Sequence, residues 1–330
     1  MNPLFDQLFA KNQGSKIFLS FTELNKTLTY DKFLNEIKCT ANCLKMFGLE
    51  KGDCLVLQIE KSHHVLTIYG ACVQLGIIFI PLNTGYTGIE VKYFLNDSEC
   101  KVFITTSKML KELDSLERKR SFNIETIDAD YKGSFFSNFN ENEPLDFIEG
   151  LDEDDTAAIL YTSGTTGQSK GAMLSQKNLL SNALTLSKAW GFTPSDILLH
   201  ALPIYHTHGL FVATNIALFS GCQIRFLKKF DIDDIILNLP STTVMMGVPT
   251  FYTRLLTNDK FNKEITKNMR LFISGSAPLL TETHKEFESR TGHKILERYG
   301  MTETNMITSN PYIGERKAGT VGIALEDVEI

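Results

Sequence analysis

The sequence has no paired cysteines. Its six cysteines are scattered over 330 residues, and no two of them form a Cys-x-x-Cys pair. Several lie inside apolar runs such as residues 68–80. Zinc sites and disulfide frameworks depend on characteristic spacings, so neither is expected. We interpret all of them as reduced core residues: Cys39, Cys43, Cys54, Cys72, Cys100 and Cys222.

Long hydrophobic runs and basic clusters are also missing. The longest apolar stretch, residues 76–82, is far shorter than the roughly 20 residues of a membrane-spanning helix. The 39 acidic residues outnumber the 33 basic ones, and no basic block is present that could bind a phosphate backbone. Residues 1–6 lack the pattern of a secretion signal. We therefore expect no membrane span and no nucleic-acid partner. We predict a cytoplasmic protein, with an organelle matrix as the alternative if a targeting signal was removed.

The order of apolar patterns predicts an α/β fold. Strand-like runs, such as residues 54–59 and 157–161, alternate with helix-like segments, such as residues 30–47. Such alternation favours mostly parallel sheets flanked by helices. The chain is also longer than the roughly 250–300 residues at which single cores stop growing. A polar, acidic stretch over residues 135–155 suggests a boundary, and we predict a first lobe over residues 1–155 and a second over residues 156–330.

The most informative stretch, residues 161–171, reads Y-T-S-G-T-T-G-Q-S-K-G and follows an apolar strand. Its glycines allow tight turns that expose backbone N–H groups to an anion, and Lys170 adds positive charge. A Walker A loop needs Gly before the lysine and Ser or Thr after it, whereas Ser169 and Gly171 stand there. We interpret the stretch as a different triphosphate loop. The alternative is a surface loop without function.

This loop resembles the signature loop of the adenylate-forming superfamily, which includes acyl-CoA synthetases, luciferases and peptide-synthetase adenylation domains. Ser169 departs from the proline that is common before the lysine. Two further motifs follow in the family's order. S-G-S-A-P-L at residues 274–279 looks like the family's adenine-flanking turn, and E-R-Y-G-M-T-E-T at residues 297–304 is similar to its Tyr-Gly-x-Thr-Glu motif. The resemblance implies the large N-terminal domain of such an enzyme, with two α/β lobes.

The resemblance also implies roles for individual residues, with ATP and coenzyme A as substrates. The phosphate loop would use Thr162, Ser163, Gly164, Thr165, Thr166, Gly167 and Lys170. Adenine would contact Gly275, Ser276, Ala277, Pro278, Tyr299 and Gly300. Glu303 would hold Mg²⁺, with Thr165 as a second candidate ligand, and Thr302 would bond the α-phosphate. Lys170, Thr302 and Glu303 are the candidate catalytic residues, because charge builds up on the transferring phosphoryl group.

The acid is predicted from charged residues near the expected acyl pocket. L-P-I-Y-H-T-H-G at residues 202–209 looks like the family's pocket entrance, and these segments closely resemble malonyl-CoA synthetases. A second carboxylate that leaves water must be paired, and a guanidinium can meet it with two parallel bonds. We predict that Arg298 binds this carboxylate with His206 and, as a further candidate, Arg254. His208 and Met301 would line the same pocket. The alternative for Arg254 is a surface or salt-bridged position.

The predicted function is ATP-dependent activation of a short acid, with malonate favoured, to acyl-AMP and then to acyl-CoA. The alternatives are a synthetase for acetate, methylmalonate or another short acid, and a non-catalytic nucleotide- or acyl-adenylate-binding module. No segment after Asn305 resembles the family's ribose-binding aspartate motif, its hinge or its C-terminal lysine. We therefore expect residues 1–330 to be an N-terminal fragment without the small C-terminal domain. By itself the fragment is expected to bind ATP weakly and to turn over poorly or not at all.

Overall fold

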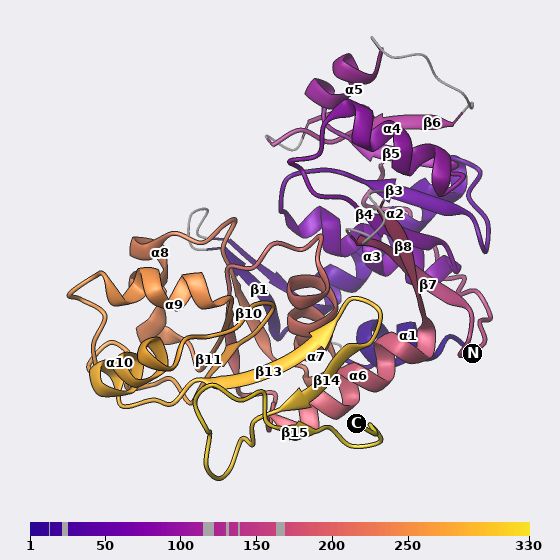
Figure 1. The fold of residues 1–330 in the computed structure, drawn as a ribbon. Coiled ribbons are helices and arrows are strands. Elements are labelled where there is room, and N and C mark those ends of the chain that lie inside the picture. Colours follow the sequence, from indigo (N-terminus) through magenta and orange to yellow (C-terminus); the bar gives the residue numbers. More distant parts are fainter. Residues whose placement is uncertain (13, 22–25, 115–121, 130–131, 138, 163–168) are drawn as a thin grey trace. The chain divides into compact units, whose positions relative to one another are not determined.

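The chain forms two compact units, which are described separately. The computed structural model describes residues 1–12, 14–21, 26–114, 122–129, 132–137, 139–162 and 169–330 (Figure 1). The first unit comprises residues 1–13, 31–180 and 204–206. The second unit comprises residues 14–30, 181–203 and 207–330. The chain therefore passes between the units several times.

The first unit is built on a six-stranded sheet in the order β6-β5-β3-β4-β7-β8. All neighbouring strands are parallel except β7 and β8. The strands are β3 (Cys54–Leu57), β4 (Ile78–Pro81), β5 (Val102–Thr105), β6 (Asn123–Thr126), β7 (Thr156–Thr162) and β8 (Lys170–Ser175). The helices are α1 (Pro3–Phe5), η1 (Asp6–Ala10), α2 (Tyr30–Met46), α3 (His63–Leu75), α4 (Gly88–Asp97), α5 (Ser107–Asp114) and η2 (Ser134–Ser137).

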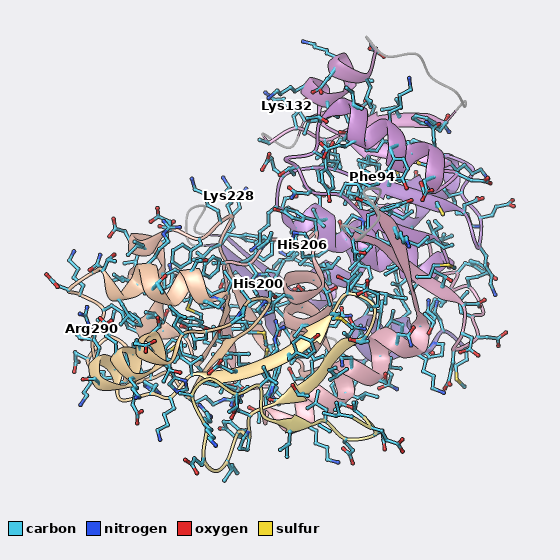
Figure 2. All side chains as sticks on the ribbon, in the orientation of Figure 1. Phe94, Lys132, His200, His206, Lys228 and Arg290 are labelled. Atoms are coloured by element: carbon cyan, nitrogen blue, oxygen red, sulfur yellow. The ribbon has the colours of Figure 1, made fainter. Side chains whose placement is uncertain are left out.

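Local signals in the sequence explain where the helices of the first unit begin and end. Gly76 ends α3 in the left-handed conformation, with φ of 69°, which costs little without a Cβ atom. Thr87 and Glu90 form a capping box at the start of α4. The apolar faces of α4 and α5 pack on one side of the sheet around Phe94 and Phe103. The side chain of Phe94 is labelled in Figure 2.

The second unit contains a nine-stranded sheet in the order β15-β14-β13-β12-β11-β9-β10-β1-β2. The central strands are parallel, and the pairs β1–β2, β13–β14 and β14–β15 are antiparallel. The strands are β1 (Ile17–Phe21), β2 (Lys26–Thr29), β9 (Ile197–His200), β10 (Gln223–Phe226), β11 (Val244–Gly247), β12 (Leu271–Ser274), β13 (Leu296–Met301), β14 (Asn305–Ser309) and β15 (Ile323–Ala324).

The helices of the second unit surround a core of aromatic and aliphatic side chains. They are η3 (His208–Thr214), α7 (Asn215–Ser220), α8 (Ile232–Asn238), η4 (Leu239–Ser241), α9 (Pro249–Leu256) and α10 (Thr281–Thr291), and α6 (Gln176–Ala189) ends in this unit. Phe272 on β12 contacts Phe287 on α10, with ring centroids 4.9 Å apart. Arg270, just before β12, forms a bidentate ion pair with Asp196, just before β9, at 2.7 and 2.8 Å.

The predicted fold class is confirmed, because both sheets are mixed with mostly parallel strands and helices flank them. The strand-like run at residues 54–59 contains β3, and the run at residues 157–161 lies within β7. The units divide the chain elsewhere than at the expected boundary after residue 155. β7 and β8 belong to the first unit because β7 pairs with β4, and β1 belongs to the second because it pairs with β10. Long-range pairing of this kind leaves no signal in local composition.

Two further expectations are met within the described residues. All six cysteines lie there as free thiols, and only Cys54 is not fully buried. Every described helix is too short or too polar to bridge a bilayer.

Candidate functional site

The expected phosphate loop lies between β7 and β8 in the first unit. Ser163, Gly164, Thr165, Thr166 and Gly167 fall outside the described residues. Thr162 and Lys170 face each other as the end of β7 and the start of β8, and the Thr162 hydroxyl donates to the Lys170 carbonyl at 3.5 Å. Lys170 is exposed. The antiparallel pair therefore holds the two ends of the loop side by side.

Two tyrosines anchor the ends of this loop to α4. Tyr93 donates its hydroxyl proton to the Ser169 carbonyl at 2.8 Å, and Tyr161 donates to Asp97 Oδ2 at 2.7 Å. Burial and the neighbouring Asp97 carboxylate raise the pKa of Tyr161, so its hydroxyl stays protonated and remains a donor. These contacts were not predictable from the sequence, because Tyr93 and Asp97 show the ordinary pattern of a half-buried helix.

In the second unit, Arg298 on β13 is buried without a counter-charge in the described part of the chain. Its side chain is 3% exposed, and neither Nε nor Nη2 has a hydrogen-bond partner among the described residues. A Cβ atom at Gly275 would lie 2.4 Å from Arg298 Cζ, so the guanidinium lies directly against the Gly275 backbone. Burial lowers the pKa of Arg298 to about 10, which leaves it charged at neutral pH. A buried unpaired charge is costly, so this position favours an anionic ligand.

Two further residues, His208 and Ser276, lie beside Arg298 and Gly275. We call these four residues the Arg298 cluster. Ser276 Oγ lies 3.2 Å from His208 Nδ1. His208 Nε2 is buried and has no partner among the described residues. Burial and the positive charge of Arg298 lower the pKa of His208 well below its usual value, so the ring is neutral at neutral pH. Ser276 has φ of 69°, an uncommon backbone conformation that often marks a functional position.

The Tyr-Gly-x-Thr-Glu residues lie in the hairpin of β13 and β14, drawn in yellow and gold in Figure 1. Tyr299 and Met301 are 44% and 45% exposed. A Cβ atom at Gly300 would lie 2.0 Å from the Asn305 carbonyl oxygen, so only glycine fits there. Thr302 and Glu303 lie in the turn, and Glu303 is exposed. Ala277 and Pro278 are exposed immediately after β12. All of these residues are accessible to a ligand.

For two predicted acid-binding residues, the structure shows contacts with side chains outside the Arg298 cluster. Arg254 on α9 is exposed, and its guanidinium carbon lies 4.7 Å from the ring centroid of Phe230. His206 belongs to the first unit, where its ring contacts Tyr205 with centroids 4.5 Å apart. The second unit by itself therefore brings together Arg298, His208 and the Gly275-Ser276 turn.

Sequence reasoning missed His200 and Tyr252. His200 is the last residue of β9, so it lies at the carboxyl end of a parallel strand, where α/β sheets bind ligands. Its place at the end of an apolar strand was the one sequence signal that could have identified His200 as a candidate site residue. Tyr252 on α9 is buried and donates to the Ile273 carbonyl at 2.5 Å.

Among the described residues, no three His, Cys, Asp or Glu side chains gather into a metal site. Mg²⁺ commonly binds through one or two carboxylates and substrate phosphates, which a single Glu303 would suit.

Comparison with known proteins places these features among nucleotide-dependent ligases. Residues 7–330 match the family described as "AMP-binding enzyme". A malonate–CoA ligase of Arabidopsis thaliana is 35% identical over 307 residues, which cover 86% of this chain and 50% of that protein. The crystal structure of ATP-bound MatB from Rhodopseudomonas palustris is 48% identical, with a TM-score of 0.94, and the match covers 98% of this chain and 65% of that one.

A third similar structure is a malonyl-CoA ligase in a ternary product complex with methylmalonyl-CoA and AMP bound. It is 28% identical, with a TM-score of 0.79, and the match covers 98% of this chain and 66% of that one. The chain thus spans about half the length of the curated plant relative and about two thirds of these solved structures.

Proposed function

The chain belongs to the AMP-binding enzyme family, and we propose that it is the ATP-binding portion of an AMP-forming acid–CoA ligase that acts on malonate. The observation that carries the choice of acid is the buried guanidinium of Arg298, which has no counter-charge among the described residues. The similar malonate–CoA ligase and MatB support the same acid.

The proposed reaction has two steps. One malonate carboxylate oxygen attacks the α-phosphorus of ATP, and pyrophosphate leaves with the electrons of the broken P–O bond. The thiolate of coenzyme A then attacks the malonyl carbonyl carbon, and AMP leaves. Both steps bring anions together, so positive charge and hydrogen-bond donors around the phosphates lower the barrier.

The residues of the two units divide this work. Lys170 and the preceding loop bind the phosphates, with the loop ends fixed by Tyr93 and Tyr161. Thr302 bonds the α-phosphate, and Tyr299 stacks on adenine beside the 275–278 turn. Glu303 would hold Mg²⁺, which would screen the phosphate charge. Thr302 and Glu303 lie in one exposed turn, where a nucleotide can reach them.

Malonate is favoured over acetate by the cost of leaving Arg298 unpaired. The distal carboxylate of malonate accepts from the guanidinium, and the neutral ring of His208 contributes a further contact. Acetate has no second carboxylate and leaves the guanidinium buried without a partner. Methylmalonate keeps both carboxylates, so it is the acid against which malonate must be compared. Met301 is proposed to line this pocket, and His206 and Arg254 are further candidates for contacts with the acid.

Isothermal titration tests this assignment on residues 1–330. The ligands are ATP and stable adenylate analogues of malonate, methylmalonate and acetate. We expect the malonyl analogue to bind at least about thirtyfold more tightly than the acetyl analogue, because truncating one partner of a buried charge pair costs roughly 2–5 kcal/mol. Arg298→Met should remove this preference while ATP affinity is retained.

Two further variants make the comparison specific. Arg254→Met shows whether the second arginine contributes to the preference. Lys267→Met removes an exposed charge that pairs with Glu264 in the same turn, and it should leave all affinities unchanged. Equal binding of the malonyl and acetyl analogues by the unaltered chain would refute malonate as the acid. Adenylate binding combined with no turnover by a full-length ligase would favour a non-catalytic module.

A further inference from the structure

His200 at the end of β9 is buried and holds a backbone carbonyl of the neighbouring turn. Its side chain is 1% exposed, and its position is labelled in Figure 2. Nε2 lies 2.9 Å from the Gly209 carbonyl oxygen. A carbonyl oxygen can only accept, so the proton of the neutral His200 ring resides on Nε2. The ring also packs against Phe226, with centroids 5.8 Å apart.

The same carbonyl receives a second side-chain bond. Thr214 Oγ1 donates to the Gly209 oxygen at 3.0 Å. A Cβ atom at Gly209 would lie 1.9 Å from the Pro203 carbonyl oxygen, so the backbone approaches at this point as closely as only glycine permits. The peptide between residues 209 and 210 is therefore fixed by two donors and by close packing.

This fixed peptide lies near the start of the π-helical segment η3, whose first residue is His208. π-Helical turns are rare in proteins, and those that occur are often found at functional sites. The imidazole of His208 is held at one nitrogen by Ser276 Oγ, 3.2 Å from Nδ1. When that hydroxyl donates to Nδ1, the neutral ring carries its proton on Nε2, which is the buried nitrogen without a partner among the described residues.

We propose that His200 is a positioning residue for acid recognition, which fixes the backbone at Gly209 and thereby the orientation of the His208 ring. His208 Nε2–H is then held ready to donate to the acid that Arg298 binds. This inference rests on the proposed function, because the acid supplies the acceptor. His200 would act through the Gly209 carbonyl, because its Nε2 is hydrogen-bonded to that oxygen.

Imidazole ¹⁵N chemical shifts test the positioning without any ligand. The chain is labelled at histidine, and His208→Gln assigns the His208 signals. We expect His208 to show one tautomer, with the proton on Nε2, in the unaltered chain. His200→Leu should average the two tautomers, whereas His200→Gln, whose amide nitrogen can still donate to Gly209, should preserve the single form. Unchanged His208 shifts in His200→Leu would overturn the proposal.

Titration with the malonyl-adenylate analogue tests the consequence. His200→Leu should weaken this analogue about tenfold relative to ATP, which corresponds to one hydrogen bond, and His200→Gln should restore most of the loss. Thr214→Val removes the second bond to the same carbonyl while His200 remains, so it should act in the same direction with a smaller effect. If His200→Leu is too unstable to study, the Thr214→Val and His200→Gln pair provides the same comparison.

These measurements distinguish a failure of the His200 role from a failure of the malonate assignment. Altered His208 shifts with unchanged relative affinity would overturn the role of His200 in acid recognition. An equal loss of affinity in His200→Leu and His200→Gln would also overturn it, because the donor would then be irrelevant. If the unaltered chain does not prefer the malonyl analogue, the proposed function fails, while the tautomer measurement still decides whether His200 positions His208.

Discussion

The guanidinium of Arg298 occupies space that is free because residue 275 is glycine. A Cβ atom at Gly275 would lie 2.4 Å from Cζ and 2.6 Å from Nε of Arg298. The two residues follow Ser274 and Glu297, which are paired in the parallel strands β12 and β13. The close approach of guanidinium and backbone therefore results directly from the register of these two strands.

Gly275→Ala is expected to displace the guanidinium and to reduce the preference for a dicarboxylate. The ratio of affinities for the malonyl- and acetyl-adenylate analogues should fall about tenfold or more, because a bidentate contact depends on orientation. The ratio is the useful quantity, since Gly275 also belongs to the proposed adenine turn. Gly150→Ala is the control, because a Cβ atom there meets nothing within 4 Å. An unchanged ratio would contradict the role of this contact.

Arg298→Met is expected to stabilise the ligand-free chain. The variant removes a buried charge that has no partner among the described residues and replaces it with an apolar side chain of similar length. Replacing buried ionic groups in this way has stabilised proteins by about 1–4 kcal/mol. Urea unfolding without ligand measures the change. A lower free energy of unfolding in the variant would show that the guanidinium is already compensated.

The ion pair between Asp196 and Arg270 is expected to make stability depend on acidity. Asp196→Asn should lower the free energy of unfolding by about 3–5 kcal/mol at neutral pH, because it leaves a half-buried guanidinium unpaired. Burial alone would raise the pKa of Asp196, but hydrogen bonds from Arg270, Thr193 and Thr243 outweigh it and hold the pKa below its usual value.

The pH dependence follows from the direction of this shift. A depressed pKa in the folded state stabilises the protein above the unfolded value of about 3.9, and the stabilisation is lost as pH falls through the lower folded pKa. Acid titration of stability should therefore show a steeper loss below about pH 4 in the unaltered chain than in Asp196→Asn. The exposed pair of Lys267 and Glu264 is the control, and Glu264→Gln should change stability by less than about 0.5 kcal/mol. Parallel profiles for both Asp196 forms would exclude this contribution.

Lys170→Ala is expected to weaken ATP binding about tenfold or more, because the lysine begins β8 at the end of the proposed phosphate loop. Lys177→Ala removes another exposed lysine, which pairs with Glu153 and lies on α6, so it should have little effect. Calorimetric titration of each variant with ATP and with adenosine, which lacks phosphates, shows whether the lost affinity depends on the phosphates. An equal change in both variants, or an equal loss for adenosine, would argue against a phosphate contact by Lys170.

Much of the fold was predictable because its signals are local. The strand-like run at residues 54–59 contains β3 (Cys54–Leu57), and the helix-like segment at residues 30–47 forms α2 (Tyr30–Met46). Strand partners were not predictable. β1 follows the first turns of the chain, yet it pairs with β10, about 200 residues later. Local composition cannot encode such a partner, which is why the expected boundary at residue 155 separates β7 from β4.

The residues of the candidate site also differ in how far they could be predicted from the sequence. Arg298 and His208 could be named from the sequence because they lie within recognisable motifs. The role of His200 could not, because a single histidine at the end of an apolar strand has the same pattern as a core residue. Only the folded turn brings its Nε2 to the Gly209 carbonyl. Arg254 was also named from its motif, and the structure adds a contact with Phe230, so its role in acid binding stays a prediction.

The sequence by itself determined the family, the α/β class and the residues proposed to bind a nucleotide and an acid, because these depend on short motifs and on local periodicity. The tertiary structure decided which charges are buried and which are exposed. It placed Arg298 against Gly275 with no counter-charge among the described residues, and it brought His200 to the Gly209 carbonyl and Ser276 to the His208 ring. Burial and orientation arise from contacts between strands and turns that are distant in the chain, so no local pattern could specify them.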